Sequence, residues 1–226
     1  MAMMCAIHDP GLPADIGQLG GRVKRGARVD FMAGYPDVEL RPRLAPSDRV
    51  EIAPYVRFTW NSFGSPILWP LGGLSLRVNV ADRPCVAAAL VLEAEAGAIL
   101  WPGSAPEVIV EPVHAGFGLS FPTRKAGVFS WGLQARAGLL PPGADGGGTT
   151  WTVGGVSSLG YEAAVAPRVA LGFFAEGGAL GQIGWTCTGG DMCSSAIFPV
   201  LRAALVVRAD TRRPPATPPP SVAPQE

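Results

Sequence analysis

The sequence predicts an all-β fold, an antiparallel up-and-down β-barrel of about ten strands that crosses a membrane. Three observations support this prediction. Polar and apolar residues alternate strictly in segment after segment, short polar turns alternate with longer loops, and no apolar run is long enough for a transmembrane helix. Successive residues of a strand point to opposite faces, whereas the faces of a helix repeat about every 3.6 residues. The period of two therefore indicates strands with one apolar and one polar face.

The composition narrows the class of protein further. The chain has 226 residues, a net charge of zero, 30 glycines and only 16% charged residues, a low share for a soluble enzyme. Its mean hydropathy of +0.26 favours a membrane protein. The most apolar run, residues 85–101, is nevertheless interrupted by Glu93 and Glu95, so a membrane helix is not expected. The balanced charge also lacks the basic surface that nucleic-acid binding requires, and we expect no nucleic-acid partner.

The alternation places the strands in order along the chain. It is clearest in residues 49–60, where Ile52 and Val56 lie on the apolar face. Glu51 and Arg57 lie on the opposite face of the same segment. Alternation and turn signals together predict strands at residues 24–35, 37–45, 49–60, 71–81, 85–99, 107–121, 128–140, 149–165, 168–184 and 196–209.

Two kinds of connection alternate between these strands. The short polar connections carry turn-forming residues and are expected on the periplasmic side. They are residues 45–48, 81–84, 122–127 and 166–168. The other connections are mostly longer, are rich in Gly, Pro and Ser, and are expected outside the cell. They are residues 61–70, 102–106, 141–148 and 186–195. Both termini then lie in the periplasm. Eight strands is the alternative count if the first hairpin is irregular.

Five tryptophans fall at strand ends beside the predicted outer loops: Trp60, Trp69, Trp101, Trp151 and Trp185. At this position an indole ring lies among the lipid headgroups with its N–H group hydrated. A soluble barrel has no physical reason to gather tryptophans at one end. We therefore predict an aromatic girdle. The alternative left open is a soluble lipocalin-like barrel, in which the apolar face would line a cavity for a lipophilic ligand.

The polar face then lines the lumen, and acidic and basic residues are mixed on it. Because an unpaired charge is costly in a narrow interior, we expect Glu and Arg side chains to pair and to fill much of the space. A wide pore is not expected, whereas a narrow water-filled path is compatible with this interior. The predicted network comprises Glu39, Arg41, Glu51, Arg57, Arg77, Glu93, Glu95, His114, Arg136, Glu162, Glu176 and Arg202.

In this pattern the chain resembles the small outer-membrane β-barrel proteins of Gram-negative bacteria. The resemblance covers most of residues 24–209, and the stretch from Asp37 to Ile52 is similar to their recurrent strand–turn–strand hairpin. It implies a location in the cell envelope, contact with outer-membrane lipid and insertion by the barrel-assembly machinery. It implies no specific activity, and the oligomeric state stays unknown.

The two ends of the chain depart from that family pattern. The last strand is not followed by the terminal aromatic residue that many such barrels have. Residues 1–20 form a predicted irregular segment without the basic and apolar regions of a secretory signal, so we expect that a signal precedes Met1 or has been removed. The barrel is predicted to span 21–209. Residues 210–226 are rich in proline and are predicted to form a disordered tail.

The cysteines suggest disulfide chemistry rather than a metal site. Cys187 and Cys193 bracket five residues of a predicted outer loop, a spacing that can close a disulfide in an oxidising compartment. No histidine lies nearby, and Asp191 is the one carboxylate between them, so we predict no metal site. Cys5 and Cys85 both fall on the predicted periplasmic side, where they are either paired or free.

Catalysis has few candidate residues. His114 on the polar face would be a general base in a barrel-embedded hydrolase of lipid or peptide, given a serine or carboxylate neighbour. No second catalytic residue lies at a recognisable spacing, so we interpret it as a lumenal polar residue. Glu93 and Glu95 share one face and are interpreted as salt-bridged. We predict a non-enzymatic barrel without a cofactor, either a structural surface barrel or a porin-like passage for small solutes.

Overall fold

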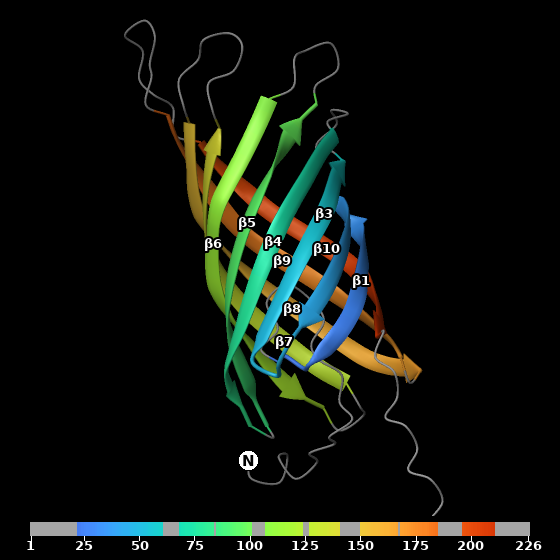
Figure 1. The fold of residues 1–226 in the computed structure, drawn as a ribbon. Helices are drawn as coiled ribbons and strands as arrows, with labels where there is room; N and C mark the ends of the chain where they lie inside the picture. Colours follow the sequence, from blue (N-terminus) through green and yellow to red (C-terminus); the bar gives the residue numbers. More distant parts are fainter. Residues whose placement is uncertain are drawn as a thin grey trace, which may run out of the picture.

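The computed structural model is a closed barrel of ten antiparallel strands in the part of the chain it describes (Figure 1). The described residues are 22–60, 68–83, 85–100, 107–123, 127–140, 150–166, 168–184 and 196–210. Each strand pairs with its neighbours in sequence, and β1 (Gly26–Tyr35) closes the barrel on β10 (Ala196–Asp210). The strands between them are β2 (Asp37–Ala45), β3 (Val50–Trp60), β4 (Leu68–Asp82), β5 (Ala87–Ile99), β6 (Glu107–Pro122), β7 (Gly127–Leu140), β8 (Thr150–Ala166) and β9 (Val169–Gly184).

The predicted antiparallel up-and-down barrel is confirmed, and the strand count is ten, not eight. The bounds of nearly all strands differ from the prediction by two residues or fewer. The largest difference is the start of β4, because Leu68, Trp69 and Pro70 continue the ladder with β3. Pro70 indicated a loop in the sequence. In the structure it pairs with Phe58 inside the ladder.

The two ends of the barrel carry different connections. The turn end is the end at which the short connections after β2, β4, β6 and β8 lie, and there β1 begins and β10 ends (Figure 1). The loop end is the opposite end. The predicted N-terminal segment 1–20 and the predicted tail lie outside the described residues, except that Asp210 is the last residue of β10. None of the described residues forms a helix long and apolar enough to cross a membrane.

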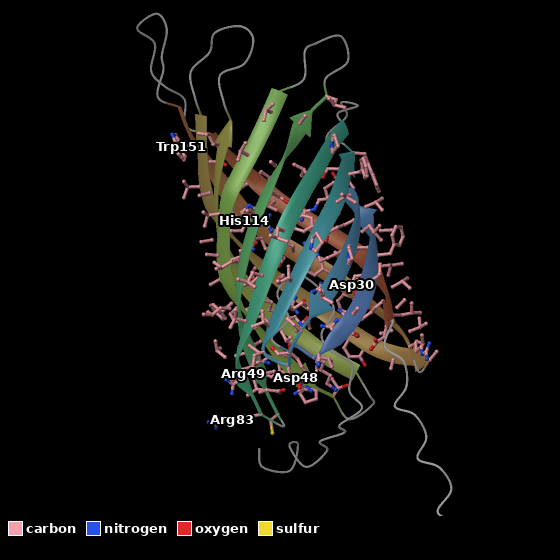
Figure 2. All side chains as sticks on the ribbon, in the orientation of Figure 1. Asp30, Asp48, Arg49, Arg83, His114 and Trp151 are labelled. Carbon is pink, nitrogen blue, oxygen red and sulfur yellow. The ribbon has the colours of Figure 1, made fainter. Side chains whose placement is uncertain are left out.

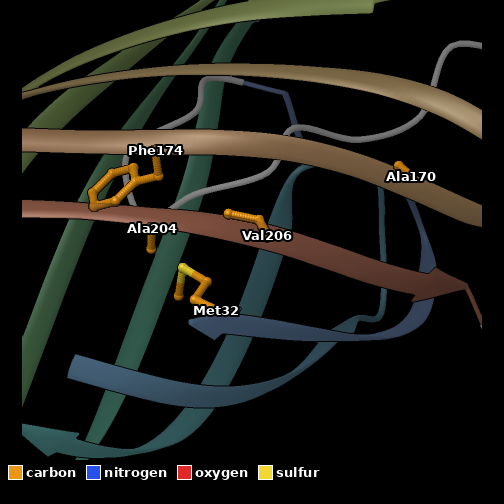
Figure 3. Close-up of a cluster of buried hydrophobic side chains, with 5 residues drawn as sticks. All are labelled: Met32, Ala170, Phe174, Ala204 and Val206. Carbon is orange, nitrogen blue, oxygen red and sulfur yellow. The ribbon is translucent and has the colours of Figure 1, made fainter. Parts of the chain in front are cut away.

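Side chains alternate between the inside and the outside of the barrel along each strand. In β2 the burial pattern repeats with a strict period of two, and the buried positions are mostly charged. The inner face also holds a small apolar cluster of Met32, Ala170, Phe174, Ala204 and Val206 (Figure 3). These residues come from β1, β9 and β10, so the cluster lies where the barrel closes.

Candidate functional site

Charged side chains line the inside of the barrel. The twelve residues predicted to form a lumenal network are all buried, with exposed fractions of 0–8%: Glu39, Arg41, Glu51, Arg57, Arg77, Glu93, Glu95, His114, Arg136, Glu162, Glu176 and Arg202. Across the described strands, eight arginines and eight carboxylates are buried, so the charge inside the barrel is balanced. Most of their ion pairs form two groups, one toward each end of the barrel, and Arg136 pairs with Glu176 apart from them.

The turn-end group consists of Arg28, Asp30, Arg43, Glu51, Arg77, Glu162 and Arg208. Glu51 on β3 is its centre. The Glu51 carboxylate accepts hydrogen bonds from Arg28 and from Nη1 of Arg43, the latter at 2.7 Å. Nη1 of Arg77 lies 3.7 Å from the same carboxylate. One acid therefore neutralises arginines from three strands.

Asp30 on β1 extends this group across the closure of the barrel. Its carboxylate accepts hydrogen bonds from Nε of Arg43 and from Nε of Arg208, the latter at 2.7 Å. Arg208 on β10 also donates to Glu162 on β8 at 3.1 Å. The group thus joins β8 and β10 to the first strands, although these residues are far apart in sequence.

The loop-end group consists of Asp37, Glu39, Arg41, Arg57, Glu93, Glu95 and Arg202, and Glu39 on β2 is its centre. Glu39 accepts hydrogen bonds from Nε of Arg41 at 2.6 Å and from Nε of Arg57 at 3.0 Å. Nη2 of Arg202 also donates to Glu39, at 3.0 Å, while its Nε donates to Asp37 at 2.8 Å. This acid therefore holds arginines from β2, β3 and β10.

A chain of polar contacts crosses the lumen from β2 to β9. Nη1 of Arg41 donates to Glu93 on β5 at 2.7 Å, and Nε2 of Gln134 on β7 donates to the same carboxylate at 3.1 Å. The Gln134 carbonyl oxygen accepts from Nε of Arg136 at 2.9 Å. Arg136 then donates to Glu176 on β9 at 2.7 Å. These contacts link side chains of β2, β5, β7 and β9 inside the barrel.

Tyr55 on β3 is held within the loop-end group by three neighbours. Its hydroxyl group donates to Glu95 at 2.8 Å, and the Arg41 guanidinium lies over its ring, 4.1 Å from the ring centre. Gly73 on β4 makes room for the ring, because a Cβ atom there would lie 2.3 Å from a ring carbon. Cation–π contact and the hydrogen bond together fix the ring across the lumen.

Apart from His114, every buried basic residue in the described strands is an arginine. A guanidinium group offers several donors in a fixed plane, so one arginine bridges two carboxylates without losing its charge. Removing one partner of such a buried pair leaves an uncompensated charge, which costs more than the pair itself contributes. The ion pairs therefore link the strands to one another, and each pair depends on its neighbours for charge balance.

The neighbours of His114 are charged residues. His114 on β6 pairs in register with Glu93 on β5 and with Arg136 on β7. Ser75 pairs with Glu93 from the far side of β5, so two strand spacings, about 10 Å, separate it from His114. The register therefore brings no serine directly beside His114. In the described part of the chain, no three His, Cys, Asp or Glu side chains are grouped to hold a metal ion.

The structure places part of the predicted tryptophan girdle. Trp60 and Trp151 are each 43% exposed and lie at the loop ends of β3 and β8. Figure 2 shows Trp151 at the opposite end of the barrel from Asp48, Arg49 and Arg83. The side chain of Trp69 and the whole of Trp101 and Trp185 lie outside the described residues.

The predicted disulfide of Cys187 and Cys193 also lies outside the described residues. None of the described cysteines is free, and Cys85 is disulfide-bonded. The alternative in which Cys85 is a free thiol is therefore wrong. Cys5, considered as its partner from the sequence, lies outside the described residues.

Several network residues were missed by the sequence analysis. Arg28 and Asp30 on β1, Asp37 on β2 and Arg208 on β10 are all buried, with exposed fractions of 0–3%. Asp37 lies two residues from Glu39 and Arg208 six residues from Arg202, so the period that predicted those lumenal residues also applies to them. Arg28 and Asp30 are polar residues that follow the same period of two in β1. Arg22 is also buried, at 2%, but it precedes β1 and no strand period could have identified it.

The outside of the barrel is apolar on all ten described strands. Exposed large apolar side chains include Phe31, Leu40, Val56, Leu74, Leu92, Phe117, Leu133, Leu159, Phe173 and Leu205, one from each strand. Among charged strand residues whose side chains are described, those not buried are Asp82 and Asp210, at the turn ends of β4 and β10. This distribution is the reverse of that in a water-soluble protein.

The chain is therefore a ten-stranded up-and-down β-barrel with charges inside and apolar side chains outside. Comparison with protein-family models, with curated proteins and with solved structures found no match. The arrangement of its side chains is thus the basis for the proposal of function.

Proposed function

We propose that the protein is a non-enzymatic outer-membrane β-barrel of a Gram-negative bacterium, whose lumen is closed by ion pairs. The observation that carries the proposal is the apolar outer face of every described strand combined with the charged interior. In lipid the outer face needs no further cover, and the closed barrel leaves no strand edge with unpaired backbone groups.

The strand lengths support the same proposal. A tilted strand needs about 9–11 residues to cross the hydrocarbon core of a bilayer. The ten strands of this barrel have 9 to 17 residues. Trp60 and Trp151 at the loop end then lie where a headgroup layer accommodates indole rings. The short turns would face the periplasm and the longer connections the outside.

A soluble barrel around a lipophilic ligand is a poorer fit to these observations. Such a ligand requires an apolar cavity, whereas the described strands turn eight arginines and eight carboxylates inward. In water the same barrel would expose apolar side chains all around its circumference, far more than a soluble monomer usually exposes. The residue distribution therefore favours the membrane.

The interior supports a closed structural barrel rather than an open passage. A continuous chain of side-chain contacts crosses the lumen, from Arg41 through Glu93, Gln134 and Arg136 to Glu176. Opening a path for a solute would require breaking ion pairs whose partners are buried, which is costly. We therefore expect low conductance from the native protein.

The test is insertion into a membrane. The full chain is refolded in detergent and into lipid vesicles, and its gel mobility is compared with and without boiling. The proposal predicts a boiling-dependent shift, flotation with the vesicles and little single-channel conductance in a planar bilayer. A monomer that stays soluble in plain buffer and does not float with vesicles would overturn it, and large stable conductance steps would overturn the closed lumen.

A further inference from the structure

The four residues before β1 are packed into the turn end of the barrel. Residues 22–25, here called the strap, are not part of a strand, yet Arg22 is only 2% exposed and Val23 is fully buried. Gly26 follows the strap with φ 140°, a conformation that other residues rarely adopt. This glycine lets the chain change direction between the strap and β1.

Three contacts hold the strap to different parts of the turn end. Nη2 of Arg22 lies 3.3 Å from the Asp82 carboxylate and 3.4 Å from the carbonyl oxygen of Arg83, at the β4–β5 turn. The backbone N–H of Arg25 donates to Asp48 at 2.7 Å, in the β2–β3 turn. The strap is thus tied to two turns that belong to other hairpins.

The strap lies on the inner side of the rim. Nη1 of Arg28, a buried member of the turn-end group, donates to the carbonyl oxygen of Lys24 at 2.9 Å. The β4–β5 turn is at least three strand spacings from β1, about 14 Å around the barrel. Four extended residues span about 13 Å, so the chain and the Arg22 side chain together reach this turn.

From these contacts we propose that the strap is a lid over the turn-end mouth of the lumen, latched by Arg22 and Arg25. The proposal rests on the proposed function, in which this mouth faces the periplasm. Releasing the latch exposes the turn-end mouth, and the turn-end group behind it, to water and small solutes, while the loop-end group stays closed. The strap and the ion pairs are then two barriers in series.

The experiment measures access to a buried thiol placed behind the lid. Ser120 on the inner face near the turn end of β6 is fully buried, and Ser120→Cys changes its size little. The full chain with S120C is refolded into vesicles, and the rate of reaction with a small charged methanethiosulfonate is measured. The same chain without S120C gives the background from the native cysteines.

Releasing the latch should raise this rate. Arg22→Ala, and separately Asp82→Ala, which leaves the strap itself unchanged, should each raise it by about tenfold, because a lost tether makes local opening easier. Adding Asp48→Ala should raise it further. Arg49→Ala is the matched control, since Arg49 is exposed and adjacent to Asp48. Hydrogen exchange of residues 22–25 in the same samples shows whether the strap has been released.

The outcomes separate the lid from the proposed function. Faster labelling with faster exchange of the strap, and no change in R49A, supports the lid. Unchanged labelling in a variant whose strap exchanges freely overturns it, as does an equal increase in R49A. Failure of the native chain to enter vesicles overturns the proposed function. In that case the strap contacts are still measured by exchange in detergent.

Discussion

The two halves of the barrel wall differ on the inside and are alike on the outside. The wall β1–β5, here called the charged wall, carries eleven of the buried charged residues of the described strands, and the wall β6–β10, here called the small-residue wall, carries five. The inner face of β6–β8 is instead rich in small residues, namely Gly118, Ser120, Ser130, Gly132, Gly138, Ser158 and Gly160. The arginines of β1–β5 pair with carboxylates of the same five strands.

Because of this asymmetry, the buried carboxylates of the two halves differ in how many arginines they pair with. Glu51 in the charged wall neutralises Arg28, Arg43 and Arg77. Glu176 in the small-residue wall has one arginine partner, Arg136, at 2.7 Å. Loss of the first acid leaves three buried cations with less countercharge, whereas loss of the second affects one.

The largest expected effect is therefore that of Glu51→Gln. We expect it to lower the free energy of unfolding by about 3–5 kcal/mol, because three buried guanidinium groups lose a shared carboxylate. Glu176→Gln, the matched variant, should lower it by about 1–3 kcal/mol. The measurement is denaturant unfolding of the barrel refolded in lipid vesicles. Equal losses would show that the two walls do not differ in the way their charges suggest.

On the outer face the two halves should respond alike. Leu92 on β5 is 51% exposed and Leu133 on β7 is 44% exposed, each near the middle of its strand. Arginine at either position should lower the free energy of unfolding in a bilayer by about 2–4 kcal/mol, because a charge then faces hydrocarbon. In a water-soluble barrel the same changes on the outer face would cost little. A small or unequal effect in vesicles would contradict a uniform lipid-facing surface.

The sequence predicted which residues face inward but not which of them meet. The period of two placed Glu93 and Glu95 on the inner face and predicted salt bridges for them, without identifying their partners. The contacts of Glu93 include Arg41 on β2, which reaches across the lumen. Such a pairing depends on closure of the barrel and on the tilt of its strands, and neither is encoded in local alternation.

The strap was also beyond sequence reasoning. Arg22 and Val23 belong to no periodic segment, and their burial follows from contacts with turns that lie far away in sequence. Strand positions, by contrast, depend on local turn chemistry and alternation, so they were predicted well even for β8 and β9. Local sequence signals thus predict the strands, whereas the contacts inside the barrel depend on residues that are far apart in sequence.

The small-residue wall has tight positions of its own. A Cβ atom at Gly154 on β8 would lie 2.0 Å from the backbone oxygen of Ala179, whereas the nearest atom to one at Gly155 would be 3.6 Å away. Gly154→Ala should therefore lower the free energy of unfolding by about 1–3 kcal/mol, since the backbone must shift. Gly155→Ala should cost far less. Denaturant unfolding of the two variants in vesicles tests this, and similar values would mean that strand spacing there adapts freely.

The smallest expected effect concerns a hydrogen bond on the outer face of the same wall. Nε1 of Trp131 on β7 donates to Oγ of Ser157 on β8 at 3.1 Å, and the Trp131 ring packs edge-on against Phe117. Ser157→Ala should cost about 0.5–1.5 kcal/mol, because hydrocarbon offers the indole N–H no other acceptor. In a double-mutant cycle with Trp131→Phe, the loss should disappear once the indole is absent. Additive losses would show that the bond does not form in the membrane.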